Sequence, residues 1–279
     1  MKIPWRLTMK NYMIAILSAL ITLPTLAAAP ALQDIKEDDF NKITKEFAAN
    51  FVHTTVTPPN SLGALFGFEV GVIGGVTRAK NIETISKSIS SSSDLKYLPH
   101  AGIMGQVTIP FGISFEGSFF PEKKFGDVTI NSMSMAAKWN LTDSILPIPL
   151  IDIATRFHFG SGEVSYATSD SVSDVPVNSK VSVESSSYGV NASVGANLLI
   201  FRPYIGAGYV WTDNTMKVNA TSGTIFDTSF TSSKEAKKKH SGSHLFAGGQ
   251  LSILLLKLGV EYSKVIDVTK YTMKLSLAF

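Results

Sequence analysis

Nine charged or imidazole side chains lie in segments that otherwise hold mainly apolar and small residues. They comprise four acids, four bases and one histidine: Glu69, Glu116, Asp152, Glu261, Lys138, Arg156, Lys257, Lys274 and His158. If they face one enclosed space, their formal charges sum to zero. We then expect an internal salt-bridge network, because an unpaired buried charge is costly. The alternative is a constriction whose separated rings of charge select small polar solutes.

Asp152, Arg156 and His158 have the residue types of an acid–base site and share one face of one segment. Asp152 lies about 20 Å from His158 along an extended chain, so it cannot orient the imidazole directly. His240 and His244 have no acid between them and form only a weak metal signal. The sequence contains no cysteine, phosphate-binding Gly loop or nucleophile elbow. We therefore predict no catalytic residue, no metal and no cofactor.

The elements that position these side chains show alternation at period two, from Gly63 to the end of the sequence. This period predicts β-strands, and we count about ten, with eight to twelve as the range. Long polar connections near 79–97, 161–182 and 213–242 alternate with short ones near 110–112 and 199–203. This asymmetry is typical of a membrane barrel with long external loops. The predicted fold is all-β, an antiparallel up-and-down transmembrane β-barrel.

The last nine residues form the clearest of these strands. Apolar side chains occupy every second position: Tyr271, Met273, Leu275, Leu277 and Phe279. Such a strand at a terminus would be an aggregation risk unless lipid covers its face and barrel closure pairs its edge. This ending resembles the C-terminal signature of Gram-negative outer-membrane β-barrels, in which alternate apolar residues lead to a terminal Phe.

The resemblance implies a location in the cell outer membrane. It also implies that these five residues are an assembly signal, read by the barrel assembly machinery. Expected partners are outer-membrane lipids and lipopolysaccharide, with no nucleic acid.

Periodicity alone does not say whether the apolar face points inward, as in a soluble barrel, or outward. The opposite face is dominated by Gly, Ser, Thr and Asn, unlike a solvated exterior. Aromatic residues near strand ends fit the girdles at the two bilayer interfaces: Trp139, Tyr188, Tyr209, Trp211, Tyr262 and Tyr271. We therefore expect the apolar side chains to face lipid.

Residues 1–29 have a basic start, an apolar stretch from Met13 to Leu26 and then small residues, which predict a cleaved signal peptide. The formal charge of +3 includes three cations of this segment, so the remainder is about neutral.

Residues 30–62 are predicted to be a periplasmic amphipathic helix and linker, and residues 63–279 the barrel. The helix follows from the spacing of apolar residues at Ile35, Phe40, Ile43, Phe47 and Phe51. We favour a helix at the periplasmic rim over a plug inside the barrel, because a Phe/Ile stripe would fit poorly against a polar lumen.

The sequence favours a small passive pore for small polar solutes or a structural barrel with a salt-bridged lumen. One alternative is a barrel enzyme that hydrolyses lipid A or peptides, favoured by a His with a carboxylate or Ser at the outer rim. The other is a surface adhesin or recognition barrel, favoured by a blocked lumen with ordered external loops. The balance of features is against an enzyme, and the oligomeric state stays open.

Overall fold

The computed structural model describes residues 37–63, 65–89, 95–125, 128–145, 147–172, 175–222 and 231–279. Within them lie the following elements: α2 (Glu37–Phe51), β1 (Gly67–Arg78), α3 (Lys80–Ile89), β2 (Tyr97–Ile109), the short 3-10 turn η2 (Pro110–Gly112), β3 (Ile113–Phe125), β4 (Val128–Asn140), β5 (Ile151–Val172), β6 (Val175–Ala196), β7 (Phe201–Ser222), β8 (Thr231–Ile253), β9 (Leu256–Val265) and β10 (Val268–Ala278). The predicted signal peptide, residues 1–29, lies outside the described residues.

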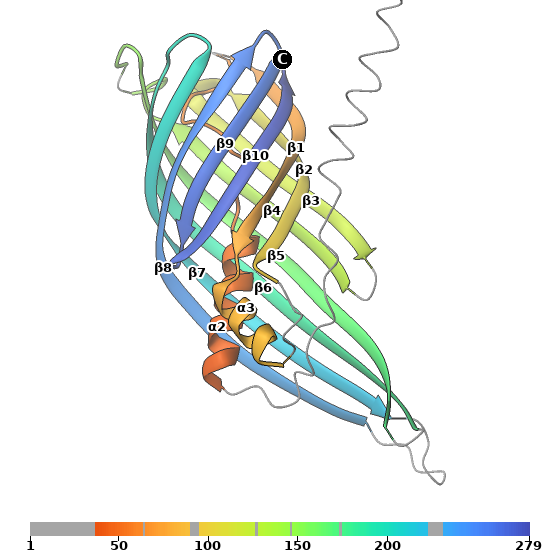
Figure 1. The fold of residues 1–279 in the computed structure, drawn as a ribbon. Helices are drawn as coiled ribbons and strands as arrows, with labels where there is room; N and C mark the ends of the chain where they lie inside the picture. The colour runs from red at the N-terminus through yellow and green to blue at the C-terminus, as the bar shows by residue number, and fades with distance from the viewer. Residues whose placement is uncertain are drawn as a thin grey trace, which may run out of the picture.

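The strands form one closed barrel, in which each strand pairs with its sequence neighbours and β1 pairs with β10 (Figure 1). All of the pairings are antiparallel. The predicted fold class, a ten-stranded antiparallel up-and-down barrel preceded by a helix, is confirmed. None of the described helices is long and apolar enough to cross a bilayer.

The register explains why alternation in sequence becomes two separate faces. Along β9 and β10, Leu256 pairs with Leu277, Leu258 with Leu275, and Val260 with Met273, all facing outward. Next to the last of these pairs, the inward Glu261 pairs with Thr272. A shift of one residue would move every apolar side chain to the other face, so these apolar cross-strand pairs fix the register.

Side-chain exposure shows that the apolar face points outward. On β5, Phe157 is 60% exposed, whereas Arg156 is 7% and His158 0% exposed. A lone barrel that exposes its phenylalanines while burying its charges is built for a lipid surrounding.

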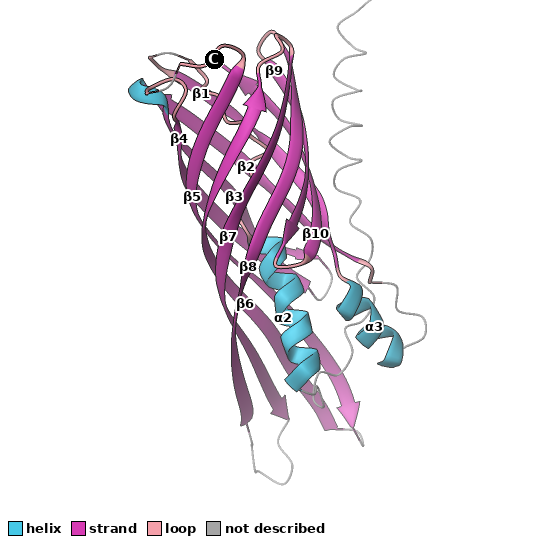
Figure 2. Cartoon of the chain, turned by 90° about the vertical axis from the view of Figure 1, so that its left-hand side faces the viewer, coloured by secondary structure: helices cyan, strands magenta, loops and turns pink. Residues whose placement is uncertain are grey.

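The two ends of the barrel differ. At the first, here called the turn end, lie the connections of η2, residues 141–150, 197–200 and 254–255, together with the start of β1 and the C-terminus. At the second, here called the long-strand end, β5, β6, β7 and β8 continue for 22, 22, 22 and 23 residues. The extended strands are visible beyond the shorter ones in Figures 1 and 2.

The long connections expected at 161–182 and 213–242 are therefore largely strand rather than loop. Their Ser, Thr and Lys residues continue the β5–β6 and β7–β8 ladders, with Tyr166 opposite Val181 and Met216 opposite Ala236. The expected loop at 79–97 contains α3. The loop prediction rested on polar composition, and it was wrong because these hairpins extend beyond the apolar band. Outside that band, polar residues are compatible with a strand.

Phe157→Lys should impair membrane assembly, because a cation facing lipid near mid-membrane costs about 2–4 kcal/mol. Ser241→Lys, on the outward face of β8 next to exposed Lys239, should assemble normally. The heat-modifiable gel mobility of membrane-inserted protein measures both. Equal assembly of the two variants would refute the outward placement of the apolar face.

Candidate functional site

The N-terminal segment lies inside the barrel. α2 contacts strands all around the wall, from β1 and β2 through β4–β8 to β10, and Figure 2 shows it between them. Residues 52–60 continue from it and are all buried. We call residues 37–60 the plug. It runs from the long-strand end, where α2 begins, to the turn end, where Leu62 N donates to Thr108 Oγ1.

This position corrects the expected helix at the periplasmic rim. The apolar stripe of α2 does not meet a polar wall: Phe40 packs against Val183 and Met216, which face inward from the long strands. On the other side, Ile43 joins a cluster with Ala79, Ile82 and Leu98. The interior is thus apolar near the long-strand end and polar towards the turn end. It therefore accommodates both a Phe/Ile stripe and a charged lumen.

Glu46 joins α2 to α3. Its carboxylate accepts hydrogen bonds from the backbone N–H groups of Asn81 and Ile82, at 2.7 and 2.9 Å, in the first turn of α3. These groups have no partner within the helix, so the carboxylate caps it. On the exposed side of α3, hydrogen bonds from Lys87 and Arg78 lower the pKa of the Glu83 carboxyl.

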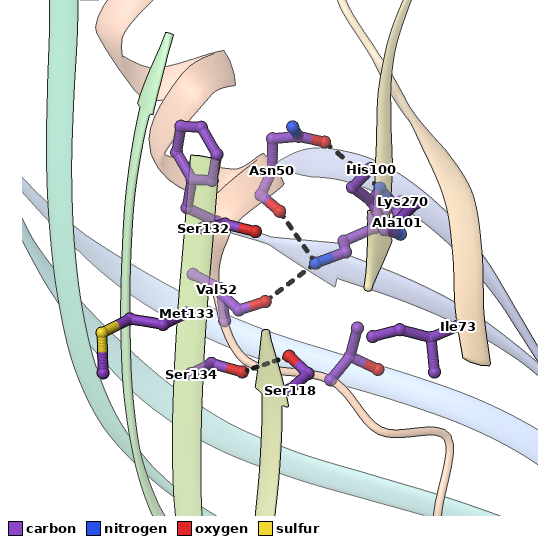
Figure 3. Close-up of a pocket in the computed structure, with 12 residues that line it drawn as sticks. Asn50, Val52, Ile73, His100, Ala101, Ser118, Ser132, Met133, Ser134 and Lys270 are labelled. Carbon is purple, nitrogen blue, oxygen red and sulfur yellow. Dashed lines mark hydrogen bonds between the residues drawn. The ribbon is translucent and has the colours of Figure 1, made fainter. Parts of the chain in front are cut away.

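Lys270 of β10 holds the other end of α2. Its Nζ donates to the carbonyl oxygens of Asn50 and Val52, at 3.1 and 2.8 Å, as Figure 3 shows. The side chain is buried, and among the described residues no carboxylate lies within ion-pair distance of it. The carbonyls at a helix C-terminus lack intrahelical partners and carry partial negative charge, so this ammonium caps the helix.

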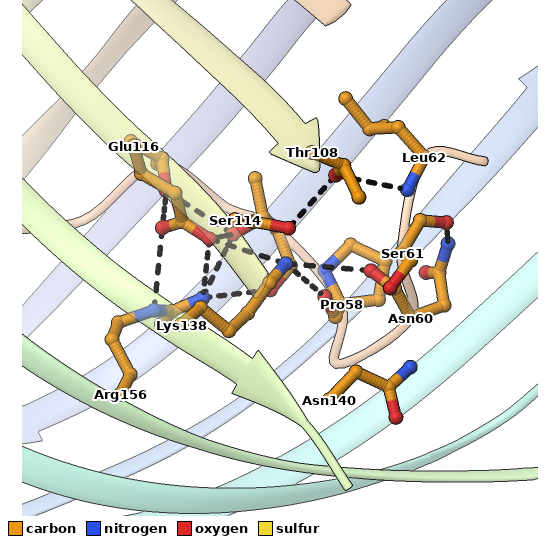
Figure 4. A network of polar contacts seen from close by, with 12 residues as sticks. Pro58, Asn60, Ser61, Leu62, Thr108, Ser114, Glu116, Lys138, Asn140 and Arg156 are labelled. Atoms are coloured by element: carbon orange, nitrogen blue, oxygen red, sulfur yellow. Dashed lines mark hydrogen bonds and ion pairs between the residues drawn. The ribbon is translucent and has the colours of Figure 1, made fainter. Parts of the chain in front are cut away.

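Glu116 is the centre of the polar network between α2 and the turn end (Figure 4). Its carboxylate pairs with Lys138 at 3.1 Å and Arg156 at 3.2 Å from the wall. From the plug, Thr55 and Thr57 donate hydroxyl hydrogen bonds at 2.7 and 2.8 Å. Lys138 also donates to the carbonyl of Pro58 at 2.9 Å. One buried carboxylate therefore satisfies two cations and fastens the plug to the wall.

Two further buried carboxylates belong to other strands of the wall, β1 and β9. Glu69 pairs with Lys274 at 2.7 Å and Lys257 at 3.5 Å. Glu261 accepts hydrogen bonds from Thr54 of the plug at 2.9 Å and from Tyr204 at 2.8 Å. The plug thus offers neutral hydroxyls to carboxylates, while most of the charge balance is within the wall itself.

The wall has glycines where the plug comes closest. A Cβ added to Gly160 would lie 2.5 Å from the carbonyl oxygen of Phe51, and one on Gly259 would lie 2.9 Å from Cγ1 of Val56. The space that these small residues leave is occupied by the chain rather than open to solutes. One remaining cavity, lined by Lys270, His100 and Ser134 among others, measures about 30 Å³, room for a water or two.

The structure places eight of the nine lumen residues in buried, inward positions: Glu69, Glu116, Lys138, Arg156, His158, Lys257, Glu261 and Lys274. Asp152 is half-buried near the turn end, 3.4 Å from Asn140 Nδ2. His158 stacks near His53 and His244, with ring centroids 5.9 and 6.0 Å away. Its two ring nitrogens have no hydrogen-bond partner.

Three functional residues escaped the sequence reasoning. Lys270 shares the inward parity of Lys274, and this parity could have identified it. His244 was considered only as a weak metal candidate with His240, but it is a buried residue of β8. His53 lies in the plug, and nothing in the sequence indicates its partners.

His53 lies between a hydroxyl and a carboxylate, an order found in hydrolases. Its Nδ1 is 2.8 Å from Ser134 Oγ, and its Nε2 is 3.3 Å from Glu116 Oε2. All three side chains are buried, and the cavity beside Ser134 has a volume of about 30 Å³. The carboxylate of Glu116 also forms ion pairs with two cations. These contacts fasten His53 of the plug to the wall.

The described residues include no group of three His, Cys, Asp or Glu side chains arranged to hold a metal ion. The five predicted assembly-signal residues of the C-terminal strand lie on its outer face, where Tyr271, Met273, Leu277 and Phe279 are exposed and Leu275 is half-buried.

A closed barrel with an apolar exterior, short turns at one end and a charged, filled interior defines the class of outer-membrane β-barrels. Within that class, the profile of DUF6588, a family of unknown function, matches residues 34–279. The chain therefore belongs to this family.

No curated protein matches the sequence. Among solved structures, the chain is similar to the translocator domain of the autotransporter NalP from Neisseria meningitidis, with 9% identity, coverage of 78% of this chain and 89% of that one, and a TM-score of 0.43. It is also similar to the attachment invasion locus protein Ail of Yersinia pestis (13%, 77% and 97%, TM-score 0.28) and to the Ralstonia pickettii toluene transporter TbuX (7%, 79% and 91%, TM-score 0.29). At these identities the likeness concerns the fold alone.

Glu116→Gln should destabilise the barrel by about 3–5 kcal/mol, because Arg156 and Lys138 would be left as buried charges without a counterion. Glu184→Gln removes an exposed pair with Lys217 and should cost less than about 1 kcal/mol. Urea unfolding in detergent micelles measures both. A similar loss in the two variants would show that the Glu116 network is not what stabilises the interior.

Proposed function

We propose that the protein is an outer-membrane β-barrel closed by its own N-terminal segment, which acts through the surface at its long-strand end. The observation that carries this proposal is the plug, residues 37–60, whose helix contacts strands around the wall and whose residues 52–60 are buried and bond to wall residues on several strands. A passive pore for small polar solutes would need this segment to leave. Of the two functions that the sequence favours, a passive pore and a structural barrel with a salt-bridged lumen, we therefore favour the structural barrel.

The long-strand end supplies the surface for a recognition role. Strands β5–β8, of 22 or 23 residues, would cover roughly 55 Å at a tilt near 40°, about twice the apolar band of a membrane barrel. The excess stands outside the bilayer, with α2 packed against β6 and β7 and α3 packed against α2. This arrangement gives the protein a rigid external face, as a recognition barrel requires.

Three partners are part of the proposal. The outward residues of β10, ending at Phe279, are available to the barrel assembly machinery. Lipids would cover the apolar exterior. Lys237 and Lys239 have side chains 75% and 86% exposed and form surface pairs with Glu235 and Asp213, for which lipopolysaccharide phosphates would compete.

Wild-type protein in a planar bilayer should show no stable conductance. Lys270→Met should open intermittent channels, because the C-terminal carbonyls of α2 lose their buried cation while the side-chain volume is nearly kept. Single-channel recording measures the open probability of both proteins.

A disulfide that locks the plug is the matched control. The chain has no cysteine, so Val56→Cys with Gly259→Cys introduces a unique pair, at positions where the added Cβ lies 2.9 Å from Val56 Cγ1. Combined with Lys270→Met, it should stay closed when oxidised and open on reduction. If the oxidised triple variant conducted as much as Lys270→Met alone, a lumen closed by the plug would be refuted.

A further inference from the structure

The turn end presents a ring of apolar side chains that no part of the described chain covers. Six of them define it: Phe66 (73% exposed), Phe111 (77%), Leu150 (68%), Leu199 (89%), Ile200 (62%) and Leu254 (97%). They come from the start of β1 and from the four connections at this end, so they follow the whole rim. Exposed apolar side chains in this number mark a surface that contacts something apolar.

Backbone conformation shows how unusual these residues are. Phe111, Leu150, Leu199 and Leu254 have φ of 68°, 62°, 58° and 55°, in the left-handed region where Gly, Asn and Asp are favoured. A polar turn former would be both relaxed and soluble at each position. All four connections at this end instead hold a large apolar residue there.

The opposite end provides the comparison. In the tight β9–β10 connection, the residues with positive φ are Ile266 and Asp267. Ile266 is only 4% exposed, and the side chain that faces water is that of Asp267. The apolar turns are therefore a property of one end of the barrel and not of its tight connections in general.

The length of the apolar face indicates what covers the ring. On β9, Tyr262 pairs with the girdle residue Tyr271, and Lys264 follows it. From Tyr262 to Leu254 the strand covers roughly 20 Å of bilayer depth, at 3.3 Å per residue and a tilt near 40°. The apolar band of a membrane barrel is about 25 Å tall. With Tyr262 at one interface, the hydrocarbon extends to the turn.

We infer that the turn end is immersed in the inner leaflet, so that lipid covers Phe111, Leu150, Leu199 and Leu254. Two observations favour lipid over a docked protein: the ring is continuous with the lipid-facing strands, and it follows the whole rim. In addition, connections 197–200 and 254–255 contain no charged residue. This inference rests on the proposed membrane location.

Depth-dependent fluorescence quenching tests it, and the absence of native cysteine allows single labels. Leu199→Cys and Leu254→Cys would carry an environment-sensitive fluorophore in full-length protein, in phosphatidylcholine vesicles with spin-labelled lipids. Phe157→Cys at mid-barrel and Asp267→Cys at the opposite turn are the controls. Both turn labels should show blue-shifted emission and lose intensity to a spin label placed high on the acyl chain, whereas the label at position 267 should not.

Each outcome is distinguishable. If the labels at positions 199 and 254 resemble that at 267 while the label at 157 is quenched, the barrel spans the bilayer but its turns are in water. The inference then fails, and the ring becomes a docking face for protein. If the label at position 157 is also unquenched, the membrane location itself is refuted.

Discussion

A buried charge must have a partner, and most of the interior depends on this constraint. Glu116 is the clearest case, because its carboxylate forms ion pairs with both Lys138 and Arg156 and also accepts hydrogen bonds from the hydroxyls of Thr55 and Thr57. Desolvating such groups is expensive, and the cost is offset only when nearly every polar atom is paired. The wall supplies the opposite charges, and the plug supplies the additional donors. The interior is therefore specified jointly by two parts of the chain.

The plug also explains the composition of the wall. Small residues on the inner face would be compatible with an open channel, and this was one reading of the sequence. In the structure, Gly160 and Gly259 lie directly against Phe51 and Val56. Glycine here provides room for another segment, so a small inward face does not by itself indicate a pore.

Much of the architecture could be read from the sequence because alternation is a local signal. The apolar face of β9 and β10 and the end of the helix at Phe51 follow from residues close together in the chain. The position of α2 could not, since its partners Val183 and Met216 lie in Ser- and Lys-rich stretches that resemble loops. Likewise, the bond between His53 and Glu116 joins residues 63 positions apart. Sequence periodicity carries no information on such pairs.

The cap on α2 has a consequence for the order in which the molecule forms. Lys270 lies on the final strand, 220 residues beyond its partner Asn50. Contacts of such long range form late, because the conformational entropy lost in closing the intervening loop must be offset before the contact can stabilise the chain. α2 therefore lacks this buried cap until β10 has formed and paired with β1. A chain truncated before β10 would lack both the β1–β10 pairing that closes the barrel and the Lys270 contacts that hold α2. The last strand therefore closes the wall and fixes the plug in one step.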